Sequence, residues 1–220
     1  MVDNRTATSR VLLPEPTLQR LPWYLSYVSS LRGRQVEYVS STQISKELNV
    51  DASQIAKDLS FLNIRGKTRI GYEVAQLEKE LQDFLGFKKA HAAVMIGVGS
   101  LGAALIQDSG LSRYGLNIVA GFDIDPRVID TPHSGVPVFN ISELNMRIPQ
   151  LKAEIGIIAV PADQAQQVAD AAITAGIKAL WNFTPCRIRT APDIVIQDTS
   201  MYSHLALIYN RLDTQAASSR

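Results

Sequence analysis

The stretch AHAAVMIGVGSLGAALI, residues 90–106, decides the fold predicted for this chain. An apolar run leads into Gly97, Gly99 and Gly102, and a helical pattern follows over residues 101–111. In a strand–turn–helix unit the first glycine permits the tight turn, the second lets the backbone approach a pyrophosphate, and the third lets the helix pack on the strand. This context favours a dinucleotide site over a glycine turn that has lost its ligand.

Apolar strand-like runs alternate with helical patterns from residue 86 onward, and one intervening helix is predicted over residues 163–175. Such near-continuous apolar strands are typical of parallel sheets covered on both faces. The sequence therefore predicts an α/β fold with a Rossmann-type parallel-sheet domain over residues 86–200. The predicted strands lie at residues 92–96, 118–124, 155–160, 179–183 and 194–196.

The cofactor site is predicted at the carboxyl ends of these strands, where ligands of open parallel sheets bind. Asp123, 26 residues after Gly97, is placed to accept hydrogen bonds from an adenosine ribose, with Asp125 as the alternative. No arginine follows Asp123 immediately, which favours NAD(H) over its phosphorylated form. Phe183 is either a contact or plain core. The predicted contacts are Gly97, Val98, Gly99, Ser100, Leu101, Gly102, Asp123, Ile124, Ala159, Val160, Pro161, Phe183 and Thr184.

The strand ends lack the acid–base group that hydride transfer needs. Pro161, Asn182, Thr184 and Cys186 stand where such a group is expected, and none is His, Lys or Tyr. Cys186 has no evident base partner and is predicted to be a structural thiol. Three histidines and one cysteine show no zinc spacing, so no metal site is predicted. No catalytic residue is assigned, and a cofactor sensor is favoured over a small NAD-dependent oxidoreductase.

Short amphipathic helical patterns dominate residues 17–85. The first helix is predicted over residues 17–31, with Pro22 early enough to be tolerated in its opening turns and Gly33 as its stop. Its apolar face is predicted to consist of Leu18, Leu21, Leu25, Val28 and Leu31.

Two short helices joined by the turn Asn-Val-Asp are predicted in VSSTQISKELNVDASQIAKDLSFLN, residues 39–63. Ser40 with Gln43 has capping-box spacing, and Asp51 with Gln54 has it more weakly. Each helix has one apolar face, which is typical of a helix-turn-helix, and the polar outer face of the second suits base edges and phosphates. A solvated α-hairpin is the alternative.

The segment RGKTRIGY, residues 65–72, holds three cations and two glycines and predicts a basic hairpin wing rather than a plain charged loop. Residues 1–90 carry 13 Lys and Arg against 10 Asp and Glu, a basic balance that agrees with a nucleic-acid partner. A winged-helix DNA-binding domain is therefore predicted over residues 17–85. Its predicted DNA contacts are Ser40, Ser41, Ser53, Gln54, Lys57, Ser60, Arg65, Lys67 and Arg69.

The two ends of the chain complete the predicted organisation. Residues 1–16 are expected to be a flexible tail, and residues 201–220 a C-terminal helix and tail. Apolar residues recur at helical spacing in that helix, which must dock either on its own domain or on a partner. No apolar run approaches the ~20 residues of a membrane span, no signal-peptide pattern is present, and one cysteine suits a reducing compartment, so a cytoplasmic protein without a membrane partner is expected. The stripe consists of Met201, Leu205, Ile208 and Leu212.

These motifs, in this order, resemble the Rex family of bacterial redox-sensing transcriptional repressors. The matching segments are RLPWYLSYV, VSSTQISKELNVDASQIAKDLS, GKTRIGY, IGVGSLGAAL, IVAGFDIDP, GVPVF, IIAVPA, AGIKALWNFTP and a final helix, across about residues 17–212. The resemblance implies a homodimer whose C-terminal helices swap. It also implies binding of palindromic double-stranded operator DNA in the free or NAD-bound state, and release of that DNA when NADH binds.

Three positions depart from the pattern that the resemblance implies. Ala56 stands where the family usually has an arginine near the recognition helix, and Gln107-Asp108-Ser109 stands where it usually has Asn-Tyr-Asn. By the resemblance, the family's interdomain switch maps onto Arg20, Asp108 and Ser200, two of which are changed. Asp198 lies close to the position of Ser200, and an Arg20–Asp108 pair could substitute. A regulator of the same build with an altered or lost NADH response, answering to another ligand or holding the dinucleotide as a structural part, is therefore the alternative.

Overall fold

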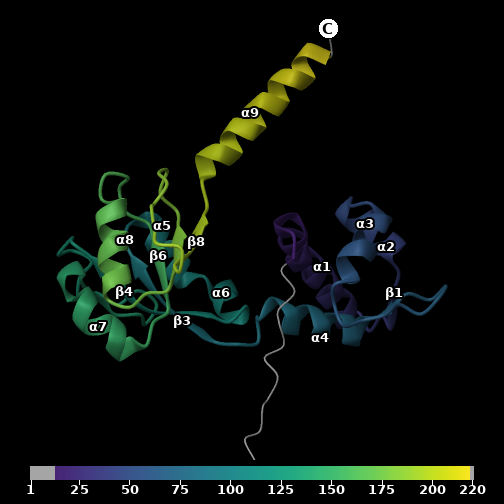
Figure 1. Cartoon of the computed structure of the whole chain (residues 1–220), viewed down its shortest axis with the longest axis horizontal. Coiled ribbons are helices and arrows are strands. Elements are labelled where there is room, and N and C mark those ends of the chain that lie inside the picture. Colours follow the sequence, from purple (N-terminus) through teal and green to yellow (C-terminus); the bar gives the residue numbers. More distant parts are fainter. Residues whose placement is uncertain (1–12, 219–220) are drawn as a thin grey trace, which may run out of the picture. The chain divides into compact units, whose positions relative to one another are not determined.

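The computed structural model of the chain describes residues 13–218 (Figure 1). These residues divide into two compact units between Lys88 and Lys89, close to the boundary predicted at residue 86. Residues 1–12 of the predicted tail lie outside the described part. The remainder of that segment is not a tail, because Leu13 is buried in the first unit and its first helix begins at Glu15.

The first unit is a winged helix, as predicted. The Ser40 side chain and Gln43 form the predicted capping box, whereas Asp51 accepts hydrogen bonds from the backbone of Ser53 and Gln54 without reciprocal help from the Gln54 side chain. Its elements are α1 (Glu15–Gly33), β1 (Tyr38–Val39), α2 (Ser41–Leu48), α3 (Ala52–Leu59), β2 (Tyr72–Glu73) and α4 (Val74–Leu85), with β1 antiparallel to β2.

Helix α1 differs from its prediction in its buried face. Leu18 is 42% exposed, whereas Thr17 and Tyr24 are buried. Thr17 is inside because its hydroxyl bonds a buried carboxylate of α3, and this rotates Leu18 out of the core. Pro22 lies in the helix interior rather than in its opening turns, and the helix includes Gly33 instead of stopping before it.

The wing is a tight turn held by a single antiparallel bridge. Lys67 and Gly71 exchange backbone hydrogen bonds of 2.7 and 2.9 Å, and β2 begins at the next residue. Gly71 has a φ of +107°, and a Cβ there would collide with the carbonyl of Val39 on β1, so only glycine fits. The predicted basic hairpin is therefore present in minimal form.

A buried carboxylate joins α1 to α3. Asp58 is completely buried and accepts hydrogen bonds from Arg20 Nε (2.7 Å) and Nη2 (2.8 Å), from Tyr24 OH (2.7 Å) and from Thr17 Oγ1 (3.0 Å). Burial raises the pKa of a carboxyl, but the hydrogen bonds that Asp58 accepts, first of all from Arg20, lower its pKa to about 2. This network was not predicted from the sequence, because the partners on α1 lie 34–41 residues away from Asp58 in the chain.

The second unit is a six-stranded parallel sheet in the order β5-β4-β3-β6-β7-β8, the Rossmann order 3-2-1-4-5-6. The chain runs outward from β3 through β4 to β5 and then crosses to β6 on the other side of β3, so the switch point lies between β3 and β6. The strands are β3 (His91–Ile96), β4 (Leu116–Asp123), β5 (Val138–Asn140), β6 (Ile155–Ile158), β7 (Ala179–Asn182) and β8 (Val195–Asp198).

Helices and loops of this unit correct the prediction in two places. The helix expected over residues 101–111 is broken at Asp108, which ends α5 and caps α6 by accepting a hydrogen bond from Gly110 N. Strand β5, the 3-10 turn η1 and helix α7 were not predicted, because three residues at a sheet edge carry too little pattern, whereas α8 was predicted over residues 163–175. The helices are α5 (Ser100–Gln107), α6 (Ser109–Arg113), the 3-10 turn η1 (Ile141–Glu143), α7 (Leu144–Leu151) and α8 (Ala165–Thr174).

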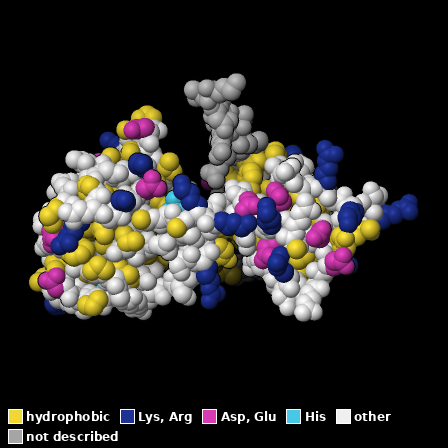
Figure 2. Space-filling model, turned by 90° about the horizontal axis from the view of Figure 1, so that it is seen from below, with side chains coloured by type: hydrophobic (Ala, Val, Ile, Leu, Met, Phe, Trp, Pro, Cys, Tyr) yellow, Lys and Arg dark blue, Asp and Glu magenta, His cyan; other side chains and the backbone are white. Residues whose placement is uncertain are grey.

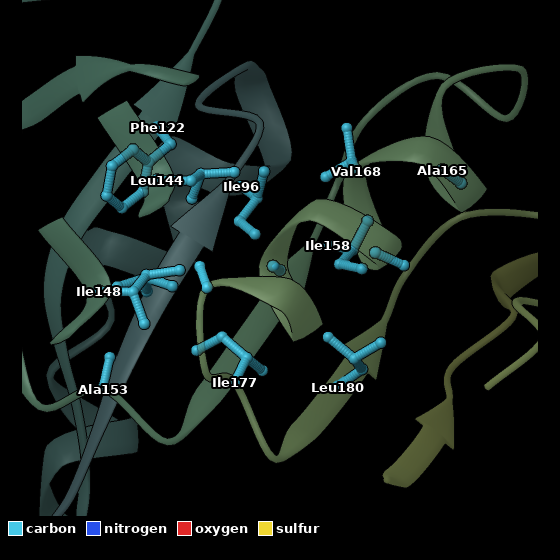
Figure 3. Packing of buried hydrophobic residues seen from close by; sticks show 14 of the residues in the cluster. Ile96, Phe122, Leu144, Ile148, Ala153, Ile158, Ala165, Val168, Ile177 and Leu180 are labelled. Carbon is cyan, nitrogen blue, oxygen red and sulfur yellow. The ribbon is translucent and has the colours of Figure 1, made fainter. Parts of the chain in front are cut away.

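The main core of this unit lies between the sheet and the helices α7 and α8 (Figure 3). Ile96, Phe122 and Ile158 come from three adjacent strands, and Ile148 and Val168 come from the covering helices. All five are at least 93% buried. The core holds the carboxyl ends of β3, β4 and β6 in fixed register, which is where the cofactor site was predicted.

The C-terminal helix α9 (Met201–Ser218) keeps its apolar side chains in solvent. Met201, Leu205, Ile208 and Leu212, the predicted stripe, are 40–57% exposed, and Tyr202 and Tyr209 are exposed beside them. Docking of this stripe on its own unit, one of the two predicted alternatives, is therefore not what the structure shows.

The first prediction concerns acid stability. Because the pKa of Asp58 lies below its ordinary value, its ionised form stabilises the fold above about pH 4, and the contribution is lost as the pH falls from about 4 to about 2. Asp58→Ala is expected to lose on the order of 2 kcal/mol from this source at pH 6 and less than about 0.5 kcal/mol at pH 2. Urea unfolding followed by Trp23 fluorescence, in a Trp181→Phe background, measures this difference. A difference that is constant from pH 6 to pH 2 would contradict it.

Candidate functional site

The glycine turn at the end of β3 is shaped by two steric constraints. Gly97 has a φ of +94°, and a Cβ there would collide with the carbonyl of Ala159 after β6. A Cβ on Gly102 would collide with the carbonyl oxygen of Gly97. At Gly99, by contrast, a Cβ would meet nothing within 4 Å. Two glycines thus serve the fold, and the third leaves open the space at the N-terminus of α5 that a pyrophosphate would fill.

Asp123 connects the end of β4 to this turn. Its Oδ2 accepts a hydrogen bond of 2.6 Å from Val98 N, and its Oδ1 accepts 2.7 and 2.9 Å bonds from the backbone of Ile124 and Asp125. A carboxylate has about four acceptor sites, so one remains for a ribose hydroxyl. The alternative, Asp125, is already held by the Arg127 side chain through Oδ1 and Oδ2, and these hydrogen bonds lower the pKa of Asp125 to about 2. This favours Asp123.

A pocket of about 230 Å³ lies against the turn at these strand ends. Seven of its lining residues are predicted cofactor contacts, and three were missed. Gln164 precedes α8 and Ile141 follows β5, the strand whose pattern was too short to recognise, while Phe122 was taken as part of a strand. The predicted lining residues are Gly97, Gly99, Asp123, Ile124, Ala159, Val160 and Pro161. Of the other predicted contacts, Ser100 is exposed, Leu101 is half-buried, and Val98 and Gly102 are buried behind the turn.

A second pocket, of about 320 Å³, shares Ile124, Ile141 and Gln164 with the first. It continues between η1 and α8, where apolar side chains are joined by the amides of Asn145 and Gln167. Apolar walls with a few amide groups suit a flat heteroaromatic ring. The two pockets together extend from the glycine turn past the end of β4.

The residues predicted beyond β7 have structural contacts. Phe183 packs on Trp181 with ring centroids 4.7 Å apart. Thr184 is buried, and its hydroxyl donates to Oδ1 of Asn182, whose Nδ2 donates in turn to Asp198 on β8. Neither residue lines the two pockets described above. Their role at a cofactor remains a prediction.

The cysteine beyond β7 has no base beside it. Among the described residues, the recorded contacts of the Cys186 thiol are the Thr184 hydroxyl at 3.2 Å and the carbonyl of Ala162 at 3.6 Å. The described chain also holds no group of three or more His, Cys, Asp or Glu side chains suited to a metal ion.

The outer face of α3 and the wing present polar and basic side chains. Ser53, Lys57 and Ser60 are exposed, whereas Gln54 is half-buried. Arg65, Lys67 and Arg69 of the wing are exposed, and Lys67 also donates to the Tyr38 hydroxyl at 2.7 Å. Ser40 and Ser41 are half-buried at the start of α2, where Ser40 serves as the cap. Figure 2 shows Lys and Arg side chains projecting from the end of this unit that carries the wing.

The three predicted switch residues each have a local partner. Arg20 is bound by Asp58 within the first unit, Asp108 caps α6 in the second, and Ser200 Oγ accepts a hydrogen bond of 3.2 Å from Ser203 N at the start of α9. The Arg20 guanidinium therefore already has a buried carboxylate partner. Each of these hydrogen bonds lies within one unit, so the interdomain switch stays a prediction.

Comparison with known proteins agrees with both units. Residues 13–60 match the family described as "Putative DNA-binding protein N-terminus", and residues 88–186 match the "CoA binding domain" family. The structure superposes on the crystal structure of RSP in complex with β-NAD+ and operator DNA with a TM-score of 0.89 and 31% identity, covering 95% of this chain and 96% of that one. For RSP in complex with β-NADH the TM-score is 0.85, with 32% identity and coverage of 95% and 98%.

Among curated proteins, the redox-sensing transcriptional repressor Rex of Bacteroides fragilis is 55% identical over 201 residues, 91% of each chain. RSP is itself described as a Rex-family repressor. The relatives are named as repressors, which confirms the prediction of a regulator rather than an enzyme. In the part of the chain that the structure describes, no helix is long and apolar enough to span a membrane. This chain belongs to the Rex family of redox-sensing transcriptional repressors.

Proposed function

We propose that this chain is a DNA-binding transcriptional repressor that senses the NADH/NAD+ ratio in the cytoplasm and releases its operator when NADH binds. The observation that carries the proposal is the pairing, in one chain, of an exposed polar helix-turn-helix face with an open glycine turn at the switch point of a Rossmann sheet. Residues 17–85 bind DNA in this proposal, residues 86–200 bind the dinucleotide, and residues 201–220 join two chains.

The dinucleotide is assigned to the two adjoining pockets. Its pyrophosphate lies at Gly99 and the N-terminus of α5, and its adenosine ribose at Asp123. The adenine ring then enters the pocket between η1 and α8, where Asn145 and Gln167 offer amide partners. The nicotinamide lies on the opposite side, toward Pro161 and the end of β7. Relatives of 31–32% identity bound to NAD+ and NADH support this assignment.

Operator DNA is assigned to α3 and the wing. The N-terminal residues of α3 meet base edges in the major groove, and the cations of the wing bind phosphates. The complex of the similar protein RSP with operator DNA supports this assignment. A palindromic duplex requires two recognition helices, and the uncovered stripe of α9 supports a homodimer that supplies both.

One observation favours a second candidate, a repressor of the same build with an altered NADH response. Asp108, which stands in place of the family tyrosine, has a local capping role on α6, and Arg20 is held by Asp58. With both residues held by local partners, the chain would bind the dinucleotide and DNA, but binding of one would change the affinity for the other only weakly.

The decisive test is a gel shift on operator DNA with each cofactor titrated separately. The duplex is one selected by the protein from a random-sequence pool. Release by NADH at concentrations where NAD+ has no effect is expected for the sensor. Release by neither supports the second candidate, and absence of any selected duplex would refute both.

The glycine turn offers a matched pair of variants. Gly99→Ala meets no atom of the chain and is expected to leave the melting temperature unchanged, but its methyl group fills the pyrophosphate space and weakens NADH binding by at least about tenfold. Gly102→Ala forces its Cβ against the Gly97 carbonyl and is expected to cost roughly 1–3 kcal/mol of stability. Calorimetry and thermal unfolding separate the two effects. Unchanged NADH affinity in Gly99→Ala would refute the assigned site.

The proposed dimer is tested on α9. Ile208→Asp puts a charge into the stripe and is expected to give monomers in analytical ultracentrifugation with loss of operator binding, because a buried unpaired charge is costly. Asn210→Asp, on an exposed position outside the stripe, is the control and is expected to remain dimeric. If Ile208→Asp stays dimeric, the stripe is not the interface.

A further inference from the structure

The side chain of Gln54 is held in place from beneath the outer face of α3. Its Nε2 donates a hydrogen bond of 2.9 Å to Oδ1 of Asp58, one turn further along the helix. Gln54 is half-buried, and its neighbours Ser53 and Lys57 on the same face are exposed. Among the predicted DNA contacts on α3, Gln54 is therefore the one whose side chain is hydrogen-bonded to a buried group.

Asp58 determines which end of the Gln54 amide faces outward. A buried carboxylate ionised by its hydrogen bonds to Arg20 can only accept, so the amide nitrogen of Gln54 must face it. The carbonyl Oε1 is then turned away from Asp58. Within the described chain, no hydrogen bond is recorded for that oxygen.

The Asp58 carboxylate is satisfied without Gln54. Arg20, Tyr24 and Thr17 of α1 supply four hydrogen bonds to its two oxygens, and a carboxylate has about four acceptor sites. The bond from Gln54 is therefore additional to what burial of the charge requires. The bond instead orders the long side chain of Gln54 before DNA binds. Without it, the entropy cost of ordering that side chain would lower the affinity for DNA.

We propose that Asp58 is a positioning residue for operator recognition: it holds the Gln54 amide so that Oε1 accepts a hydrogen bond from the exocyclic amine of one base in each half-site. This rests on the proposed DNA-binding function. In the major groove only adenine N6 and cytosine N4 offer such an amine, whereas guanine and thymine present acceptors to that atom. The second N–H of Nε2 can donate to N7 of the same adenine. Specificity at this base pair thus depends on a carboxylate that never touches DNA.

The test compares affinities for two duplexes. One is selected from a random pool by the wild-type protein, and the other has a single base in each half-site replaced by its analogue without the amine, purine for adenine or 2-pyrimidinone for cytosine. Wild-type protein is expected to lose about tenfold in affinity at one position only. Gln54→Ala is expected to bind both duplexes equally at that position.

The decisive variant is Gln54→Glu, which keeps two acceptor oxygens but cannot donate to Asp58 and is repelled by it. Both Gln54→Glu and Asp58→Ala are expected to lose the tenfold discrimination. Discrimination is the ratio of the affinities for the duplexes with and without the amine, so any uniform effect of the added charge cancels. Tyr24→Phe removes a different hydrogen bond from the same carboxylate and is the matched control. It is expected to lower stability while keeping full discrimination.

Each outcome decides the proposal. Discrimination retained by Gln54→Glu, or lost to the same degree in Tyr24→Phe, would show that Asp58 acts only through stability and would overturn it. If Asp58→Ala fails to fold, Gln54→Glu and the amine-free duplexes still give the answer. Failure to select any duplex overturns the proposed function itself, and selection without loss on removing an amine overturns this inference alone.

Discussion

The close approach of α5 to the turn before it sets the geometry of the second unit. Gly102 lies so near the Gly97 carbonyl that no side chain fits between them, and Gly97 in turn lies against Ala159 after β6. These contacts bring the ends of β3 and β6 and the start of α5 to one point. Asp123 then fixes the turn from the β4 side through Val98 N. Gly97 and Gly102 fix the path of the backbone through the turn, and this path leaves open space at Gly99.

In the first unit, the hydrogen bonds of the buried Asp58 set the arrangement of the helices. The apolar core of α1, α3 and α4 surrounds one ionised group, Asp58, whose partners come mainly from α1. A buried charge without its hydrogen bonds is costly, so the helices can pack only in the arrangement that satisfies it. Apolar packing tolerates small shifts between helices, whereas the four hydrogen bonds from α1 to the two oxygens of Asp58 do not. The rotation of α3 against α1 is therefore fixed.

The sequence predicted what depends on spacing. The glycine motif, the five longer strands and the Ser40 capping box each have a local signature that survives in the fold. What it missed depends on contacts between distant residues. Asp58 stands between Ile55 and Leu59 on an apolar face, and that position was the available signal, but its partners are 34–41 residues away. Leu18 is exposed because Thr17 bonds that carboxylate. The pocket residue Ile141 was missed together with β5, whose three residues are too few for a pattern.

Helix α9 has a consequence for how much of the protein is needed. Helix α9 has eighteen residues and an apolar stripe that its own unit leaves uncovered, so it gains little of the packing that stabilises most helices in proteins. In the proposed homodimer, the ordering of this helix depends on association between two chains, so it increases with protein concentration. On that proposal, dilution of the protein in the cell, through growth or lowered expression, lowers the occupancy of the operator even at a constant cofactor ratio. The amount of the protein then acts on the operator independently of the cofactor.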